Sequence, residues 1–211
     1  MSRTKSRSDF NNSQIRGFIN FAFHDYIASR TLLQKGLASQ GTILAITAVE
    51  KILKAICLLH NEDIIVSGRG HTLTNMIDKL KIKDSSLLTS KDEEFLKFIE
   101  KAYKLRYPDN LSSAFKLNLP SLRILENLDR TFCRLTESKK VIEINPDKKM
   151  YDVYITQNNQ LLKNNNVHFN AQLENKLSEE KQKYAKYESN GIILKESFCW
   201  TTDIKHNDNW E

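Results

Sequence analysis

The 211 residues contain no long apolar run, no apolar stretch within the first nine positions and no closely spaced cysteines. Its longest apolar stretch is interrupted by charged residues and falls short of the roughly 20 residues of a membrane-spanning helix, so no membrane span is expected. The first nine residues, MSRTKSRSD, are basic and polar, so no secretory signal is expected either. Cys57, Cys133 and Cys199 show no paired spacing, which favours buried thiols in a reducing cytoplasm over disulfides or a zinc site.

The sequence also lacks the patterns of several common catalytic and binding sites. It shows no Ser-His-Asp or Cys-His arrangement, no distinctive carboxylate pair and no metal-ligand spacing. The stretch Ser67-Gly68-Arg69-Gly70 is glycine-rich, but it matches neither the Walker pattern nor the dinucleotide-binding pattern. No internal repeat is visible. We therefore expect neither a metal nor a cofactor.

Charge is distributed unevenly along the chain. Residues 1–140 carry 23 Lys and Arg against 15 Asp and Glu, whereas residues 141–211 carry 9 against 11, so the net charge of +6 divides into +8 and −2. An excess of basic residues favours contact with nucleic acid or nucleotide phosphates, so the first range is where we expect such a site. The alternative is a solvated, lysine-rich surface. Both readings stay open at this point.

The most apolar stretch, residues 41–60, predicts the central helix of a helical bundle. At about 1.5 Å per residue it would be roughly 30 Å long, the width of a small domain. Thr47, Glu50, Lys51 and Lys54 interrupt its apolar character, and their spacing places them on one stripe of the helix. We expect this stripe to be the one face that is not used for packing.

Apolar side chains at helical spacing predict four further helices, over residues 10–33, 73–80, 90–105 and 120–135. Gly36 and a turn at Ser39–Gly41 are expected to reverse the chain between the first helix and the central one. Ser90 is a candidate N-cap, because acidic residues follow it in the first turn. Pro108 is expected to end the fourth helix.

Residues 141–211 differ in composition, with eleven asparagines. Strands are expected over 150–155 and 192–200, with an amphipathic helix over 167–187 between them. The predicted fold is therefore all-α, an antiparallel bundle of four to five helices over residues 1–140. A small α+β appendage over residues 141–211 would form a second unit.

Three motifs of residues 1–140 stand in an order typical of one family. They are AVEKILKAI at Ala48–Ile56, then HTL at 71–73 followed by MIDKL at 76–80, then a tyrosine and Arg106-Tyr107-Pro108-Asp109. In these places residues of about 10–140 resemble the HEPN domain, the higher-eukaryote and prokaryote nucleotide-binding domain. The resemblance implies a bundle of four or five helices, commonly a homodimer with a polar or basic cleft at the dimer junction.

One branch of this family consists of metal-independent ribonucleases of toxin–antitoxin and phage-defence systems. In these an arginine is separated by four to six residues from a histidine. Arginine can hold the phosphate, and histidine can transfer a proton to or from the ribose. Here Leu111, Ser112 and Ser113 stand where the histidine would follow Arg106. The RYPD form instead resembles the branch that travels with minimal nucleotidyltransferases and is usually described as nucleotide-binding or as a partner subunit.

Our first hypothesis is therefore a cytoplasmic module that binds nucleotide or RNA and has a nucleotidyltransferase as a possible partner. Arg106 would contact phosphate, and Glu50, Lys54 and Asp109 would hold the arginine in place. Tyr103 and Tyr107 could stack on a base, with a place in the core or an interface as the structural alternative. The structural alternatives are a helix-end cation for Arg106, a cap for Asp109 and a surface i, i+4 pair for Glu50 and Lys54.

Two other hypotheses are kept. In the second, the chain is a ribonuclease in which His71 or Tyr107 replaces the missing histidine as the proton donor. His71 follows the glycine-rich stretch, where helix capping is the structural alternative. In the third, the chain is a structural interaction protein with no ligand.

Overall fold

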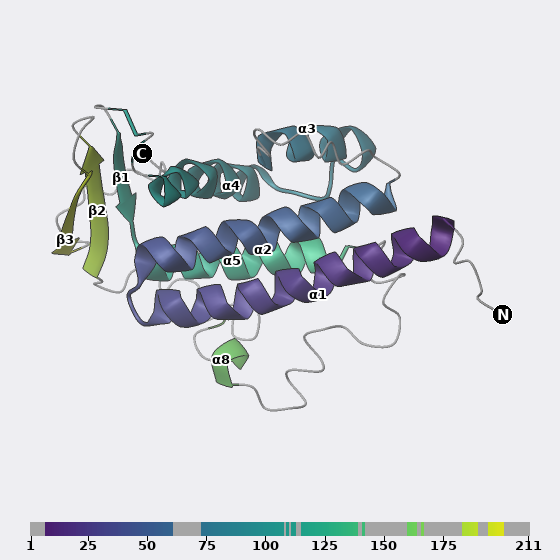
Figure 1. The fold of residues 1–211 in the computed structure, drawn as a ribbon, viewed down its shortest axis with the longest axis horizontal. Helices are drawn as coiled ribbons and strands as arrows, with labels where there is room; N and C mark the ends of the chain where they lie inside the picture. Colours follow the sequence, from purple (N-terminus) through teal and green to yellow (C-terminus); the bar gives the residue numbers. More distant parts are fainter. Residues whose placement is uncertain are drawn as a thin grey trace.

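Five helices make up most of the described chain, and a small antiparallel sheet lies at one end (Figure 1). The structure is a computed structural model that describes residues 7–60, 73–107, 109, 111–112, 115–138, 141, 160–163, 166, 183–189 and 194–200. The helices are α1 (Arg7–Gln34), α2 (Ala38–Leu59), α3 (Leu73–Lys83), α4 (Ser90–Tyr103) and α5 (Ser121–Thr136). The strands are β1 (Lys116–Leu119), β2 (Lys183–Ser189) and β3 (Leu194–Trp200), and the short helical turns are η1 (Lys104–Arg106) and α8 (Gln160–Lys163). This arrangement confirms the predicted helical bundle with a small C-terminal region that contains strands.

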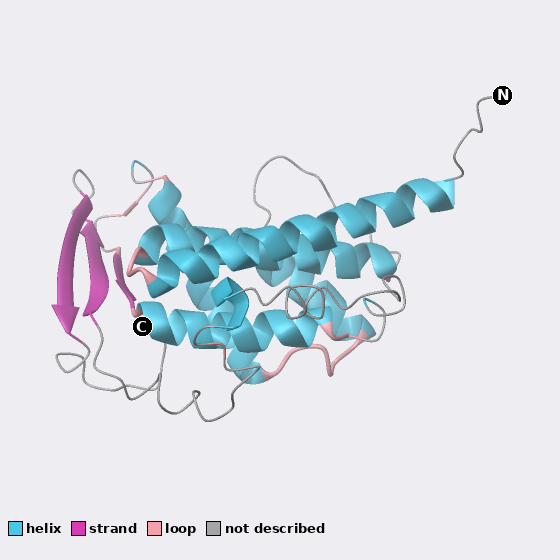
Figure 2. Ribbon diagram, turned by 90° about the horizontal axis from the view of Figure 1, so that it is seen from below, coloured by secondary structure: helices cyan, strands magenta, loops and turns pink. Residues whose placement is uncertain are grey.

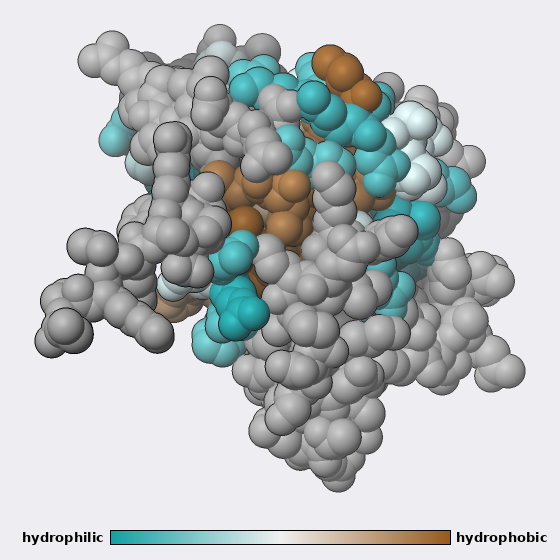
Figure 3. Space-filling view, turned by 90° about the vertical axis from the view of Figure 1, so that its right-hand side faces the viewer, coloured by the Kyte–Doolittle hydropathy of each residue, from teal (hydrophilic) through white to brown (hydrophobic). Residues whose placement is uncertain are grey.

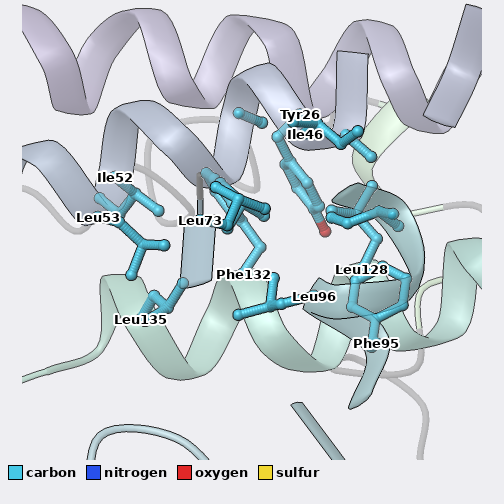
Figure 4. Packing of buried hydrophobic residues seen from close by; sticks show 14 of the residues in the cluster. Tyr26, Ile46, Ile52, Leu53, Leu73, Phe95, Leu96, Leu128, Phe132 and Leu135 are labelled. Carbon is cyan, nitrogen blue, oxygen red and sulfur yellow. The ribbon is translucent and has the colours of Figure 1, made fainter. Parts of the chain in front are cut away.

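Helix α2 is the central helix, as its apolar sequence predicts. It contacts α1, α3, α4 and α5, and the side chains of Ala45, Val49, Ile52 and Leu53 have no exposed surface. Figure 4 shows this core from close by, with Ile52 and Leu53 of α2 above Leu135 of α5. Because each fully buried aliphatic side chain contributes about 1.5–3 kcal/mol, this layer holds the helices together.

Helices α1 and α2 form an antiparallel hairpin whose turn differs from the predicted one. Gly36 makes the turn with a φ of +77°, a left-handed conformation that glycine adopts without strain. The predicted turn at Ser39–Gly41 is wrong, because these residues lie in the first turn of α2. Gly41 instead lets the helices approach closely. A Cβ atom at this position would lie 2.7 Å from Cγ of Leu33, and the Gly41 carbonyl accepts a 2.7 Å hydrogen bond from the Ser29 hydroxyl.

The polar stripe of α2 is partly covered by α1, so the prediction that it takes no part in packing is wrong. Lys51 forms an ion pair with Asp25 of α1, and its Nζ lies 5.8 Å from the centroid of the Phe21 ring. These contacts are possible because α1 carries a carboxylate and an aromatic ring where it crosses the stripe. Glu50 and Lys54 form the i, i+4 pair that their spacing allows, with 2.5 Å between Oε1 and Nζ.

Helix α4 is capped by Thr89 and not, as predicted, by Ser90. The Thr89 hydroxyl accepts a 3.2 Å hydrogen bond from the Asp92 N–H, and Oδ2 of Asp92 accepts one of 2.8 Å from the Thr89 N–H. This capping box needs its acidic partner three residues after the cap, and Asp92 is three residues from Thr89 but only two from Ser90. Asp92 also ties α4 to α5, because it accepts a 2.8 Å hydrogen bond from Thr131 and pairs with Arg134 at 2.9 Å.

The sheet has the strand order β1-β2-β3, and both pairs of strands are antiparallel. Leu117 of β1 lies opposite Tyr187 of β2, and both side chains are buried. The Tyr187 hydroxyl donates a 2.5 Å hydrogen bond to Oε1 of Glu196 in β3, and β2 contacts α2. The sheet is therefore in contact with the central helix.

The predictions for the C-terminal range hold in part. The strand expected over 192–200 is confirmed by β3. The helix expected over 167–187 is wrong at its end, where the residues from Lys183 onward form β2. Pairing with β1 on one side and β3 on the other outweighs the local helical periodicity there. The rest of that helix and the strand expected over 150–155 lie outside the described residues, and β1 was not predicted at all.

The described residues between α5 and β2 pack against the helices as well. Figures 1 and 2 show α8 beside the bundle, and α8 contacts α1. The side chains of Leu162 and Asn166 have no exposed surface, and Nδ2 of Asn166 donates a 3.3 Å hydrogen bond to the Tyr26 hydroxyl. The Tyr26 ring in turn stacks on Phe132 of α5, with 4.3 Å between ring centroids. The division of the chain into two units after residue 140 stays a prediction.

Figure 3 shows the end of the molecule at which α3 lies. Hydrophilic side chains dominate the described surface there, around an apolar area near the centre of the view. Within the described ranges, no helix combines the length and the apolar character that a membrane crossing requires. Cys57 and Cys133 are buried thiols, as predicted, whereas the side chain of Cys199 lies outside the described set.

Candidate functional site

The residues of the motif Arg106-Tyr107-Pro108-Asp109 follow the end of α4. The α-helical part ends at Tyr103, and the 3-10 turn η1 follows it directly. The N–H of Tyr107 then donates a 3.0 Å hydrogen bond to the Lys104 carbonyl. Tyr107 leaves the helical conformation, with φ −129° and ψ 73°, because the following proline disfavours helix at the preceding residue. The helix end therefore brings an arginine and two tyrosines together within about one turn.

Arg106 contacts both tyrosines. Its Nη1 donates a 2.6 Å hydrogen bond to the Tyr103 hydroxyl, and its guanidinium carbon lies 5.6 Å from the centroid of each tyrosine ring. Both distances fall within the range of about 6 Å for cation–π contacts. The rings of Tyr103 and Tyr107 meet edge to face, with centroids 6.3 Å apart and an interplanar angle of 77°. These contacts orient the guanidinium, and we call the three residues the Arg106 cluster.

The Arg106 cluster lies on the surface and is positively charged. Arg106 is exposed, and Tyr107 retains 50% of its accessible surface. The hydrogen bond that Arg106 donates to the Tyr103 hydroxyl raises the pKa of Arg106 above its ordinary value, so the guanidinium stays charged at physiological pH. Cations are favoured at a helix C-terminus even without a ligand. What distinguishes Arg106 from an ordinary helix-end cation is its contact with two aromatic rings.

An arginine and a half-exposed tyrosine in this arrangement suit a nucleotide. Guanidinium carries five N–H donors, and the hydrogen bond to Tyr103 uses one of them. The others remain for phosphate oxygens, which arginine binds through charge-assisted hydrogen bonds. The exposed part of the Tyr107 ring offers a surface on which a base can stack. The arrangement can therefore hold a molecule that carries both a phosphate and a planar ring.

The other predicted site residues do not join the Arg106 cluster in the part of the chain that the structure describes. Asp109 is exposed, and no hydrogen bond or ion pair connects it to Arg106 there. Glu50 and Lys54 pair with each other on α2, and neither is bonded to the cluster within the same ranges. His71 lies outside the described residues. The functional roles of these four residues stay predictions.

Of the residues that the structure describes, Tyr107 lies beside Arg106, but no histidine is hydrogen-bonded to it. The described histidines are His24, whose ring meets Phe21 edge to face on α1, and His60, which caps the end of α2. Neither of these two is hydrogen-bonded to Arg106. Among the described residues, no group of three or more His, Cys, Asp or Glu side chains could hold a metal ion.

The role of Tyr103 as a partner of Arg106 was not predicted from the sequence. The sequence suggests Tyr103 as a ring that could stack on a base, whereas the structure makes its hydroxyl the hydrogen-bond acceptor for Arg106. The available signal was the i, i+3 spacing, because residues three apart overlie each other in a 3-10 turn.

Comparison with known proteins places the cluster inside a recognised domain. Residues 15–128, more than half of the chain, match the model of the HEPN domain. The matched range runs from α1 into α5 and includes the whole Arg106 cluster. No curated protein and no solved structure matches the chain.

Proposed function

Because the chain belongs to the HEPN domain family, we propose that it binds a nucleotide or RNA and acts with a partner protein in a toxin–antitoxin or phage-defence system. The observation that carries this proposal is the Arg106 cluster, an exposed guanidinium in contact with two tyrosine rings. Phosphate and base are the two chemical groups that such a cluster recognises.

The site residues then have distinct roles. Arg106 binds phosphate, Tyr103 orients the guanidinium, and the exposed ring of Tyr107 stacks on the base. Glu50, Lys54 and Asp109 support the site in a ligand-bound or dimeric form. The partly buried ion pair of Glu50 and Lys54 is compatible with that role, because the pair holds both side chains in one geometry.

Binding without cleavage is the favoured reading. General acid–base catalysis on RNA needs a group that titrates near neutral pH within reach of the ribose and the leaving oxygen. Leu111, Ser112 and Ser113 occupy the positions where family ribonucleases carry histidine. In the alternative, a ribonuclease in which Tyr107 or His71 donates the proton, cleavage would be metal-independent and would require Arg106.

The motif Arg106-Tyr107-Pro108-Asp109 supports assignment to the branch that accompanies minimal nucleotidyltransferases, which makes such an enzyme the proposed partner. We further propose that the chain forms a homodimer in the cytoplasm. The buried thiols of Cys57 and Cys133 are compatible with this reducing compartment. Residues 141–211, as a second unit, would extend the dimer or recruit the partner.

The proposal is tested by incubating the protein, metal-free and in low salt, with a mixture of structured RNAs and scoring both cleavage and retention. The variant Arg106→Ala is run beside Arg16→Ala, which removes an exposed arginine from α1. We expect retention without cleavage, and we expect it to be lost only in Arg106→Ala. The same RNAs and nucleotides should raise the unfolding temperature of the wild-type chain, because a ligand of the folded state stabilises it.

Three other outcomes would change the account. Cleavage that disappears in Arg106→Ala would establish the ribonuclease alternative. Retention that is equal in both variants would remove Arg106 from the site. Absence of both retention and thermal stabilisation would leave the third hypothesis, a structural interaction protein.

A further inference from the structure

Three exposed lysines follow one face of α4 toward the Arg106 cluster. Lys97, Lys101 and Lys104 are spaced by four and three residues, which places them on the same side of a helix. Lys104 keeps helical backbone angles, φ −60° and ψ −26°, so η1 continues that face. None of the three forms an ion pair with another described residue. We call them the lysine track.

The acidic residues of α4 are mostly committed elsewhere. Asp92 is buried in the helix cap, where it accepts hydrogen bonds from Thr89. Glu93 pairs with Lys81 of α3 at 2.7 Å, and Glu100 accepts a 2.7 Å hydrogen bond from Thr74. Glu94 is exposed, but it precedes the lysine track and lies at the end away from Arg106. A hydrogen bond from the neutral Thr74 leaves Glu100 charged. The lysine track and Arg106 carry four positive charges, against the three carboxylates of Glu94, Glu100 and Asp109 nearby, so this face keeps a net positive charge.

We propose that the lysine track binds the phosphate backbone of a single-stranded nucleic acid whose end contacts the Arg106 cluster. This inference rests on the proposed function and names the ligand class, an oligonucleotide strand in place of a mononucleotide. From Lys97 to Arg106 the helical rise adds up to about 14 Å. At roughly 3.4 Å per stacked nucleotide this length corresponds to about four nucleotides.

A single strand fits these observations better than a duplex or an acidic protein. Tyr107 at the end of the track can stack only on a base that is not paired inside a duplex. Lysine ammonium groups act as point charges, which suit phosphate contacts that do not depend on sequence. An acidic protein would satisfy the lysines but would offer no ring to the Arg106 cluster.

The first test measures how salt weakens the binding of an eight-nucleotide single-stranded RNA. The triple variant Lys97→Gln/Lys101→Gln/Lys104→Gln is compared with the control Lys35→Gln/Lys91→Gln/Lys195→Gln, which removes three exposed lysines from elsewhere. Glutamine keeps a helix propensity close to that of lysine, so both triples should unfold at temperatures near that of the wild type.

The expected difference follows from counterion release. With a slope of about −0.7 per phosphate contact, four cations make the affinity fall about 50-fold between 50 and 200 mM salt, whereas Arg106 alone gives about 3-fold. The wild type and the control triple should therefore show about 50-fold weakening, and the track triple about 3-fold. Equal weakening in the two triples would overturn the lysine track.

The second test is a length series of one, two, four and eight nucleotides in RNA and in single-stranded DNA. Affinity should rise up to about four nucleotides and show the same lysine dependence in both backbones, because both carry the same phosphates. Three results would each overturn the lysine track. They are an affinity that does not rise beyond the mononucleotide, lysine dependence in only one backbone, and equal competition by polyglutamate of matched charge.

Binding that depends on Arg106 but not on the lysine track would overturn this inference alone. Absence of binding by the wild type, or binding unchanged in Arg106→Ala, would overturn the proposed function itself.

Discussion

Arg30 of α1 and Asp129 of α5 form an ion pair in which neither side chain has any exposed surface. The same carboxylate oxygen of Asp129 accepts a 2.7 Å hydrogen bond from the Tyr26 hydroxyl, and Asn166 donates to Tyr26 in turn. Two helices and a residue that follows α8 thus meet at one buried polar group. Charges this far from water persist only when they are paired and hydrogen-bonded.

Removing both partners of this pair should cost less stability than the two single removals added together. Arg30→Met or Asp129→Leu alone is expected to lower the free energy of unfolding by about 3–5 kcal/mol, because each leaves an uncompensated buried charge. The double variant should lose less than the sum of the two single variants. Urea unfolding of the four proteins measures the coupling, and strict additivity would show that the two charges do not stabilise each other.

Gly41 should not tolerate a methyl group. In Gly41→Ala the new Cβ would lie 2.7 Å from Cγ of Leu33, so α1 and α2 must move apart at a cost of about 1–3 kcal/mol. The matched control is Gly17→Ala on α1, where a Cβ meets no atom within 4 Å. That control should gain up to about 1 kcal/mol from the higher helix propensity of alanine. Chemical denaturation of both variants tests the close approach, and equal effects would speak against it.

The cap of α4 can be located by two alanine substitutions. Thr89→Ala removes the hydroxyl of the capping box and should cost about 1 kcal/mol, within a range of 0.5–2. Ser90→Ala changes the first helical residue and should alter the stability by less than about 0.5 kcal/mol. The denaturation midpoints decide between them. The reverse order of effects would restore Ser90 as the cap.

Stability should fall in alkali as the pH rises from 10 to 12. Burial, assisted by the hydrogen bond to Glu196, raises the pKa of Tyr187 to about 12 from an ordinary value of 10. Below pH 10 this tyrosine is neutral in both states and its contribution to stability is complete. Above pH 10 the unfolded chain releases the proton first, so the contribution is lost progressively up to about pH 12. Burial also raises the pKa of Tyr26 well above its ordinary value, which acts in the same direction.

The measurement is the free energy of unfolding at several values between pH 9 and 11.5 for the wild type and Tyr187→Phe. The variant should be less stable at pH 9, because it lacks the hydrogen bond to Glu196, but its stability should fall less steeply with pH. Parallel curves would mean that Tyr187 does not titrate with folding in this range.

The helices could be predicted because their signals are local. The apolar run around Ala48–Ile56 and the spacing of apolar residues in α1, α4 and α5 repeat over several turns, and tertiary packing agrees with them. The strands depend on distant partners. Leu117 of β1 pairs with Tyr187 of β2, and a four-residue strand carries too short an alternation to be recognised without that partner. The same pairing explains why residues after Lys183 abandon their helical periodicity.

The site shows the same limit. The motif in the sequence names Arg106 and Tyr107, and local spacing brings Tyr103 beside them. Asp109 belongs to the same motif but is exposed, with no bond to Arg106 in the described ranges, so closeness in sequence alone did not predict contact. Glu50 and Lys54 paired with each other as their spacing allows. No local pattern can place them relative to a residue some fifty positions further along.

The most direct test of the central claim is the dissociation constant of an eight-nucleotide single-stranded RNA for the wild type, Arg106→Ala and Arg16→Ala in low salt. Charge-assisted hydrogen bonds to phosphate are worth about 1.5–3 kcal/mol, so Arg106→Ala should bind about 10- to 150-fold more weakly while Arg16→Ala stays near the wild type. Equal affinities in all three proteins, or no binding by any of them, would contradict the assignment of Arg106 as the phosphate-binding residue.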